Sequence, residues 1–283
     1  MSNARKMAVG FGMVLVLCAT SATASTAVPT WAPAATAAIH PGVQVVTPAG
    51  QCTANFVFYD DQNVYIGQAA HCTSLGGPTD TDGCTTPSLD LGTPVAIDGA
   101  SKPGILAYNS WIAMQAAGED DPDVCESNDL ALVRIDPADV GTVNPSVPHW
   151  GGPVIGTSPG TTAGQRLFSY GNSSLRLGLT VLSPKVGLSL GTTNNGWKHY
   201  SLTITPDVPG DSGSPYLDAR GRALGQLSTL EVAVGLPPLA NGVGDLRREL
   251  AYLNEHPPAD ITSPVQLALG TEPFNPNQLP LGI

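Results

Sequence analysis

The stretch "VPGDSGSP", residues 208–215, decides how this sequence is interpreted. Its glycines, prolines and aspartate surround Ser212, and all three residue types favour tight turns. Ser212 therefore belongs either to an ordinary turn or to a sharp bend that presents a nucleophile. The stretch alone does not distinguish these interpretations, so the evidence must come from the rest of the chain.

The composition is that of a globular protein built from short strands. Of 283 residues, 42% are hydrophobic and 12% are charged, which excludes a disordered chain. The sequence holds 32 glycines and 26 prolines, and few stretches have helical periodicity. These features predict many β-strands joined by turns.

Residues 1–24 have the pattern of a secretory signal peptide. Arg5 and Lys6 precede an apolar run over residues 7–19, and small residues follow at 22–24. A membrane-spanning helix needs about 20 apolar residues, more than this run provides. We therefore expect a secreted protein, extracellular or in the cell envelope, without stable membrane insertion after cleavage.

The charge balance is acidic. Removal of residues 1–24, which contain two basic and no acidic residues, changes the net charge from −11 to −13. No block rich in lysine and arginine occurs, so a nucleic-acid partner is not expected. We expect a protein or peptide substrate and a monomer.

Four cysteines remain after the signal peptide, and an even number in an exported chain predicts disulfides. They are Cys52, Cys72, Cys84 and Cys125. Zinc binding has little support, because no C-x-x-C spacing occurs. Cys18 permits a lipid-anchored alternative, but the leucine before it does not suit a lipobox. No metal or cofactor is expected.

Alternating or β-rich runs occur in both halves of the chain, and a proline- and glycine-rich connection separates them. The dipeptide Asn195-Gly196 between two such runs predicts a hairpin. The expected strands cover residues 43–46, 54–59, 64–68, 104–114, 130–135, 166–170 and 186–193.

One amphipathic helix is expected near residue 250. It begins near Asn241 or Asp245 and ends before Pro257. Its predicted apolar face consists of Val243, Leu246, Leu250 and Leu253.

Three motifs in order identify a family. "VYIGQAAHCTS" carries His71, "SNDLALVRI" carries Asp129 and "PGDSGSP" carries Ser212. Together they resemble the trypsin/chymotrypsin-like serine proteases, in a bacterial-type secreted form. The resemblance implies an all-β fold with two antiparallel six-stranded β-barrels, a C-terminal α-helix and an active site in the cleft between the barrels.

The resemblance also implies a domain organisation. A flexible leader at 25–42 precedes a protease domain at 43–283. Within it we expect an N-terminal barrel at about 43–140, a linker at about 141–163, a C-terminal barrel and helix at about 164–256, and an extended tail at 257–283.

Each motif residue takes a role from the family. Ser212 is the expected nucleophile, His71 the general base, and Asp129 the acid that orients the imidazole. The backbone N–H groups of Gly210 and Ser212 form the expected oxyanion hole. Taken singly, His71 could be a structural histidine and Asp129 an Asx-turn residue.

The sequence also departs from the animal digestive enzymes. It lacks an Ile-Val-Gly-Gly segment whose new N-terminus could pair with the acid before the serine. Asp211 is therefore expected to pair with an internal arginine, and Arg134 and Arg166 are the candidates.

The substrate pocket is the least defined part. The resemblance implies a floor at or near Pro206, with Asp207 next to it, and a wall that begins at Ser228 and continues through Thr229 and Leu230. Two specificities follow as alternatives: a narrowed pocket for small or modest apolar side chains, or an Asp207 that reaches a lysine or arginine.

The resemblance implies a disulfide between Cys52 and Cys72, which leaves Cys84 and Cys125 as a second pair. The acidic loops at 78–83 and 118–126 raise calcium as an alternative, but neither has the EF-hand spacing.

The expected function is that of a secreted serine endopeptidase that works through an acyl-enzyme. The alternative is a catalytically silent binding protein of the same fold. An α/β-hydrolase is disfavoured, because Ser214 stands where the G-x-S-x-G motif needs glycine.

Overall fold

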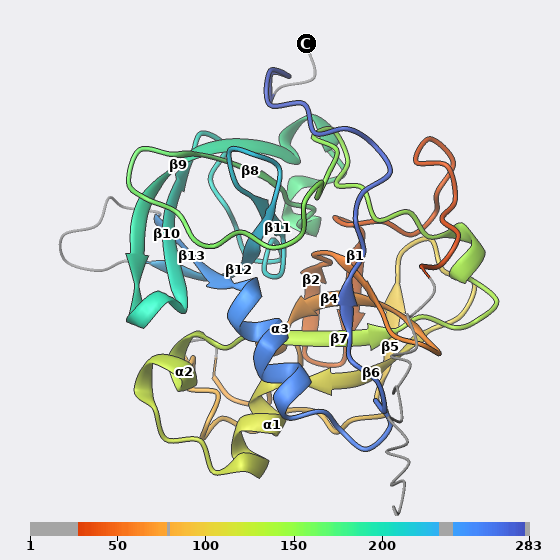
Figure 1. The fold of residues 1–283 in the computed structure, drawn as a ribbon, viewed down its shortest axis with the longest axis vertical. Helices are drawn as coiled ribbons and strands as arrows, with labels where there is room; N and C mark the ends of the chain where they lie inside the picture. Colours follow the sequence, from red (N-terminus) through yellow and green to blue (C-terminus); the bar gives the residue numbers. More distant parts are fainter. Residues whose placement is uncertain (1–27, 78–79, 232–239, 281–283) are drawn as a thin grey trace, which may run out of the picture.

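The computed structural model describes residues 28–77, 80–231 and 240–280. The predicted signal peptide at 1–24 lies outside the described residues. The chain forms two β units, a sheet from the first half and a barrel from the second, and α3 (Leu246–Glu255) runs from the barrel across the sheet (Figure 1).

The first unit is an eight-stranded antiparallel sheet. Its strands are hydrogen-bonded in the order β14-β3-β4-β7-β6-β5-β1-β2. The strands are β1 (Gln44–Thr47), β2 (Gly50–Thr53), β3 (Val57–Tyr59), β4 (Val64–Ala69), β5 (Pro94–Ile97), β6 (Gly104–Asn109), β7 (Leu130–Arg134) and β14 (Gln266–Leu267).

The second unit is a closed six-stranded barrel with the order β10-β13-β12-β11-β8-β9. The predicted hairpin is confirmed, because β9 and β10 pair and the turn Asn194–Gly196 joins them. The strands are β8 (Arg166–Tyr170), β9 (Pro184–Thr193), β10 (Lys198–Thr203), β11 (Pro215–Leu217), β12 (Ala223–Glu231) and β13 (Ala240–Asp245).

The prediction of two six-stranded barrels is correct for the second unit only. The first sheet has eight strands and is not closed, since its outer strands β14 and β2 are not hydrogen-bonded to each other. Two contacts explain the difference. At one edge of the sheet, β14 pairs with β3. At the other edge, the backbone N–H of Thr53, at the end of β2, donates to Ser212 O of the second unit at 2.8 Å.

The structure corrects the expected strand at 104–114. The strand β6 ends at Asn109, whose side-chain oxygen accepts hydrogen bonds from the backbone N–H groups of Trp111 and Ile112. This N-cap begins a helix at the point where the predicted strand was expected to continue. The helices that the sequence did not reveal are α1 (Ser110–Ala117) and α2 (Pro122–Ser127), with 3-10 turns at Ala70–Thr73, Val140–Thr142, Ser174–Arg176 and Thr180–Leu182.

The predicted C-terminal helix is confirmed as α3, and Asp245 is its N-cap. The Asp245 carboxylate accepts from the backbone N–H of Arg248 at 2.9 Å. The helix ends at Glu255, before Pro257. Val243 does not belong to its apolar face, because it lies in β13 and is buried inside the barrel.

The expected flexible leader packs on the first unit from residue 28 onward. Trp31 contacts the ring of Tyr59, and Ile39 is completely buried. The backbone N–H of Ala32 donates to Val143 O at 2.9 Å. These apolar side chains gain burial only by lying against the sheet, which accounts for the ordered path.

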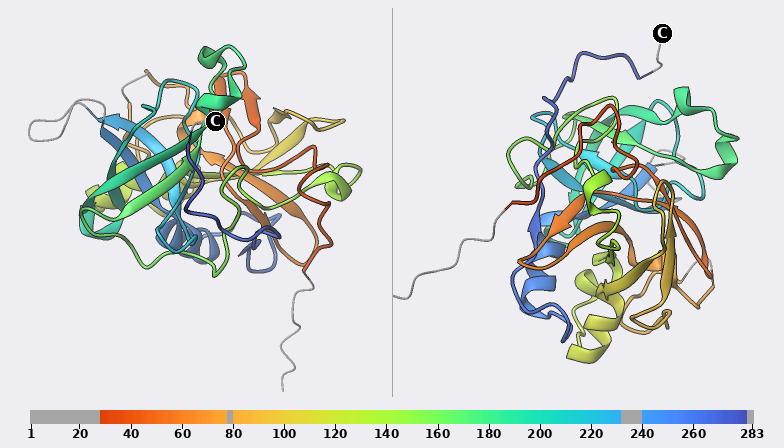
Figure 2. Two further views of the ribbon diagram at one scale, coloured as in Figure 1. Left: turned by 90° about the horizontal axis from the view of Figure 1, so that it is seen from above. Right: turned by 90° about the vertical axis from the view of Figure 1, so that its right-hand side faces the viewer.

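The tail beyond residue 256 runs along both units, as Figures 1 and 2 show. After β14 it reaches the second unit, where Phe274 packs edge-on against Phe168 with ring centroids 5.1 Å apart. Nearby, Arg166 Nη2 donates to Pro276 O at 2.8 Å. The tail therefore connects the sheet to the barrel.

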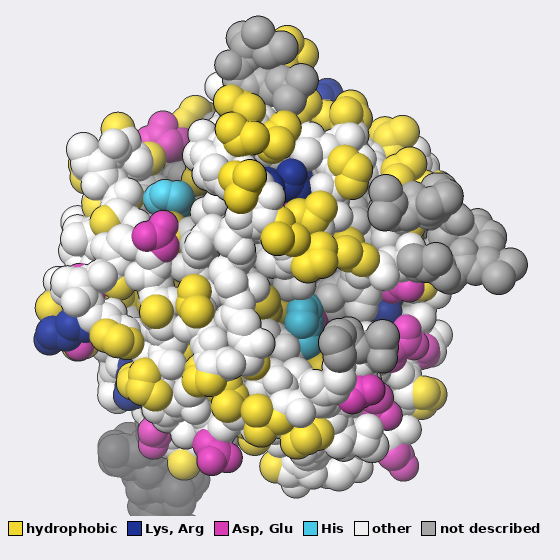
Figure 3. Space-filling view, turned by 180° about the vertical axis from the view of Figure 1, so that it is seen from behind, with side chains coloured by type: hydrophobic (Ala, Val, Ile, Leu, Met, Phe, Trp, Pro, Cys, Tyr) yellow, Lys and Arg dark blue, Asp and Glu magenta, His cyan; other side chains and the backbone are white. Residues whose placement is uncertain are grey.

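The chain carries more acidic than basic residues, 23 against 12. On the face shown in Figure 3, acidic side chains are more widely spread than basic ones, in line with a net charge of −11. Among the described residues, no helix is long and apolar enough to cross a membrane.

Candidate active site

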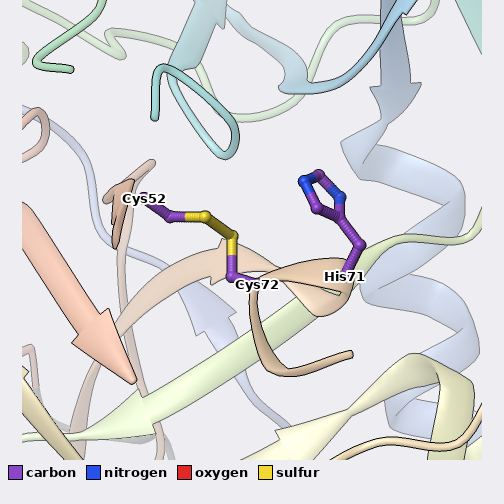
Figure 4. Close-up of side chains that lie close together, drawn as sticks. All are labelled: Cys52, His71 and Cys72. Atoms are coloured by element: carbon purple, nitrogen blue, oxygen red, sulfur yellow. A yellow bond between two sulfur atoms is a disulfide. The ribbon is translucent and has the colours of Figure 1, made fainter. Parts of the chain in front are cut away.

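His71 lies on a short 3-10 turn that directly follows β4. The next residue, Cys72, forms a disulfide with Cys52 at the end of β2, so the turn is covalently attached to a neighbouring strand. Figure 4 shows the imidazole of His71 standing beside this disulfide. The strand and the disulfide together fix the backbone from which the imidazole projects.

The carboxylate of Asp129 contacts His71 at two points. Its Oδ2 lies 2.7 Å from His71 Nδ1, and its Oδ1 accepts from the backbone N–H of His71 at 2.8 Å. Burial opposes protonation of the imidazole, but the charge and hydrogen bond of Asp129 outweigh it and raise the pKa of His71 above 6.5. With Nδ1 facing the carboxylate, Nε2 is left as the basic nitrogen.

Asp129 is itself held by three further groups. Its side chain is 3% exposed. Ser228 Oγ donates to Asp129 Oδ2 at 2.6 Å, and the backbone N–H of Asp129 donates to Glu249 Oε1 at 3.0 Å. Its carbonyl accepts from Ala70 N–H at 2.7 Å, which links the Asp129 loop to the His71 turn.

Ser212 comes from the loop between β10 and β11 of the other unit. Its carbonyl accepts from Thr53 N–H at 2.8 Å. The next residue, Gly213, has φ +87°, and a Cβ there would lie 2.3 Å from Thr53 O and 3.0 Å from the nitrogen of Ala69. Ala69 ends β4, two residues before His71, so this close approach brings the serine loop against the His71 turn.

The Ser212 hydroxyl makes no hydrogen bond to His71 or to any other described residue. In structures without substrate, nucleophile–base hydrogen bonds are often long and tighten only when substrate binds. The structure therefore contains the His71–Asp129 pair fully formed and places Ser212 on the adjoining loop.

The backbone around Ser212 leaves two donors free. Neither the N–H of Gly210 nor that of Ser212 donates to an acceptor within the described residues. Gly210 has φ +93°, and its carbonyl accepts from Gln51 Nε2 at 3.0 Å and Thr53 Oγ1 at 2.9 Å. These bonds fix the peptide of Gly210, and a side chain there would clash with Gln51.

Asp211 is completely buried and paired with two cations. Its Oδ2 contacts Arg176 Nη2 and lies 2.7 Å from Lys185 Nζ. Its Oδ1 accepts from the backbone N–H of Ser173 at 3.0 Å. Although burial opposes ionisation, Lys185 and Arg176 lower the pKa of Asp211 below its ordinary value.

The prediction that Asp211 pairs with Arg134 or Arg166 is therefore wrong. Arg166 stacks over Phe168 and bonds the tail, and Arg134 lies in β7 of the first unit. The actual partners come from a turn and a strand beside the serine loop, where chain folding brings them close.

The expected pocket floor contains no free charge. Pro206 is exposed, whereas Asp207 is 2% exposed and forms an ion pair with Lys185. Tyr216 donates its hydroxyl to Asp207 Oδ2 at 2.6 Å. Asp207 is therefore unavailable to a lysine or arginine of a substrate in this structure.

The expected wall residues lie on β12. Ser228 is buried and bonds Asp129, whereas Thr229 bonds Glu231 and Leu230 is 40% exposed. Residues 232–239, which follow this strand, lie outside the described residues. The first of the expected wall residues thus contacts Asp129, and the role of the three residues as a pocket wall stays a prediction.

Both predicted disulfides are present in the structure. Besides Cys52–Cys72, Cys84 is joined to Cys125 of α2, four residues before Asp129. Sulfur atoms in disulfides are not thiolate ligands, so the close grouping of Cys52, Cys72 and His71 does not form a metal site.

Several residues that shape the site were not foreseen. Arg176 and Lys185 had no motif to mark them. Glu249 did carry a signal: it stands three residues after Leu246 and four before Leu253, so an acid interrupts the apolar face of α3. It is completely buried.

No protein-family model and no curated protein matches the sequence. Among solved structures, protease A of Thermobifida fusca shares 19% identity over 83% of this chain and 100% of that chain, with a TM-score of 0.52. A glutamic acid-specific serine protease that uses a histidine triad in substrate binding shares 16% identity over 81% of this chain and 100% of its own, with a TM-score of 0.50.

The chain has the fold of the trypsin/chymotrypsin-like bacterial serine proteases. At these identities the likeness is one of fold. What this chain does must therefore be argued from its own residues.

Proposed function

We propose that this protein is a secreted serine endopeptidase that hydrolyses peptide bonds through an acyl-enzyme. The observation that carries the proposal is the Asp129–His71 pair, formed with a 2.7 Å contact beside the loop that holds Ser212. The bacterial serine protease fold supports the same conclusion.

In the proposed reaction, Ser212 Oγ attacks the carbonyl carbon of the substrate while its proton passes to His71 Nε2. The negative charge that develops on the carbonyl oxygen is bound by the N–H groups of Gly210 and Ser212. Collapse of this intermediate breaks the C–N bond, and the leaving amine takes the proton from His71. A water molecule then attacks the ester while His71 takes its proton. The second intermediate collapses, and Ser212 Oγ leaves with the proton that His71 returns.

Asp129 supports this chemistry from behind. It keeps the Nδ1 proton of His71 in place and stabilises the imidazolium that forms when Ser212 gives up its proton. The raised pKa of His71 is consistent with this role, because a stronger base takes the serine proton more readily.

Export is part of the proposal. Two disulfides persist most readily in an oxidising compartment, and residues 1–24 have the signal-peptide pattern. A protein or peptide is the proposed substrate.

A fluorophosphonate probe tests the proposal, because it labels only activated serines. The mature wild-type protein should be labelled, and Ser212→Ala and His71→Ala should not. Ser174→Ala is the matched control, since this serine is exposed and outside the site. Equal labelling of Ser212→Ala and wild type would contradict the proposal. A folded wild type that is neither labelled nor able to cleave a peptide library would favour the catalytically silent binding protein.

A further inference from the structure

A second carboxyl group lies directly against Asp129. Glu249 of α3 is completely buried, and its Oε1 accepts two hydrogen bonds. One comes from the backbone N–H of Asp129 at 3.0 Å and the other from Gln226 Nε2 at 2.7 Å. A single oxygen atom of Glu249 thus joins α3, β12 and the residue that orients His71.

The other oxygen of this carboxyl is isolated. Glu249 Oε2 is buried and has no hydrogen-bonding partner among the described residues. An ionised carboxylate needs partners for both oxygens or a nearby cation. A neutral acid fits better, with Oε1 as the carbonyl oxygen that accepts both bonds and Oε2 as the protonated oxygen.

The charges that face Glu249 also favour the neutral acid. Asp129, directly before β7, and Asp245 at the end of β13 are acidic, Tyr108 of β6 is a phenol, and β12 presents the neutral Gln226. The neighbouring helix α1 has the sequence SWIAMQAA, without a charged residue.

Burial, together with Asp129 and Asp245, raises the pKa of Glu249 to about 8, against the two hydrogen bonds that favour its ionised form. The group is therefore mostly protonated at pH 7 and ionises in the mildly alkaline range.

We propose that Glu249 is a positioning residue of the active site, which as a neutral acid holds the backbone of Asp129 and on ionisation weakens the Asp129–His71 arrangement. The effect on turnover rests on the proposed function. Ionisation places a second negative charge beside the Asp129 carboxylate, in a region with little solvent to screen it. Repulsion between the two carboxylates then acts on Asp129 and disturbs the position from which it contacts His71.

The first test does not depend on activity. The imidazole resonances of His71 are followed by NMR from pH 5 to pH 10 in the full mature chain, wild type and Glu249→Gln, with His71→Ala for assignment. Glutamine keeps an oxygen that accepts both hydrogen bonds but cannot ionise. The wild type should show a step near pH 8 in addition to the titration of His71 itself, and Glu249→Gln should lack that step.

Lys185 requires attention in this experiment, because burial lowers its pKa to about 8 as well. A step that arises from Lys185 persists in Glu249→Gln, whereas a step that arises from Glu249 disappears. An identical step near pH 8 in both proteins, or no such step in the wild type, overturns the proposal.

The second test measures the rate of labelling by the fluorophosphonate probe between pH 6 and pH 10, with each protein scaled to its own maximum. The wild-type rate should fall between pH 8 and pH 9 relative to Glu249→Gln, by up to about fivefold, the limit for one ionising group with a pKa of about 8. Superimposable profiles overturn the proposal. If neither protein is labelled at any pH, the proposed function fails, and the NMR step still decides the role of Glu249.

Discussion

The ammonium group of Lys185 lies 2.7 Å from the carboxylate of Asp211, and both side chains are completely buried. Asp211 directly precedes Ser212. Because Lys185 also pairs with Asp207 and Asp211 also pairs with Arg176, two cations and two anions balance beside the serine loop. The shape of the serine loop thus depends on ion pairs within the mature chain.

Lys185→Met should destabilise the protein strongly. It leaves two buried carboxylates with Arg176 as the remaining cation, and breaking a buried pair in this way costs about 3–5 kcal/mol. Urea unfolding at pH 7 measures the loss. Lys102→Met is the matched control, because Lys102 is 59% exposed and its pair with Asp136 is 3.5 Å long; its effect should stay below about 1 kcal/mol. Similar losses in both variants would show that the buried ion pairs contribute no more to stability than the exposed Lys102–Asp136 pair.

Glu249→Gln should change how stability depends on pH. The pKa of Glu249 is raised in the folded state from 4.5 to about 8, so between these values the folded chain holds a proton that the unfolded chain has lost. Stability of the wild type therefore falls as pH rises through this range, by roughly 1.4 kcal/mol per pH unit from this group. The glutamine variant lacks this slope. Urea unfolding at pH 5.5, 6.5 and 7.5 should show its advantage growing with pH, and a constant difference would contradict the expectation.

Ser228→Ala should lower activity without unfolding the protein. It removes the 2.6 Å hydrogen bond to Asp129 Oδ2, and loss of a bond to a charged group costs about 1.5–3 kcal/mol. We expect the labelling rate of the variant to be at least about tenfold lower than that of the wild type. Its melting temperature should stay within a few degrees of the wild-type value. Ser88→Ala is the control, because its buried hydroxyl has no partner among the described residues. An unchanged rate in Ser228→Ala would show that this bond does not help to orient Asp129.

Substrate preference should be for a neutral residue before the cleaved bond. Asp207 is paired with Lys185 and accepts a hydrogen bond from Tyr216, so its carboxylate is not free to bind a basic substrate side chain. Mass spectrometry of a peptide library digested by the mature protein gives the preference directly. Dominant cleavage after lysine or arginine would mean that substrate binding rearranges the Asp207 pair.

Seven of the fourteen strands among the described residues lie in runs that the sequence predicted, because these runs are rich in apolar and β-branched side chains. β8 was predicted with its actual bounds, and β1, β4 and β7 within about one residue. The run at 104–114 was misassigned because its β-rich side chains continue past Asn109, whereas a single amide cap converts the second half to helix. The pairing of β14 with β3 was not predictable. The two residues of β14 carry no sequence pattern, and they pair only because β3 offers a free edge.

The motifs identified His71, Asp129 and Ser212 because each lies in a distinctive local sequence. The structure gives the contacts between His71 and Asp129, whereas the catalytic roles of the three residues remain predictions. The partners of Asp211 could not be predicted, because several arginines and lysines occur in the second half and a contact between residues 176 and 211 leaves no trace in local sequence. Distant contacts of this kind depend on the finished fold.

The path of the tail has a consequence for how the chain matures. β14 and Phe274 follow α3 in the sequence, yet they cover β3 and Phe168, which are synthesised much earlier. A chain still emerging from a ribosome or an export channel therefore has an open strand edge on its first unit, a feature that invites pairing with other chains. Both units receive their last contacts together, so the nascent protein passes through a stage in which neither half is fully covered.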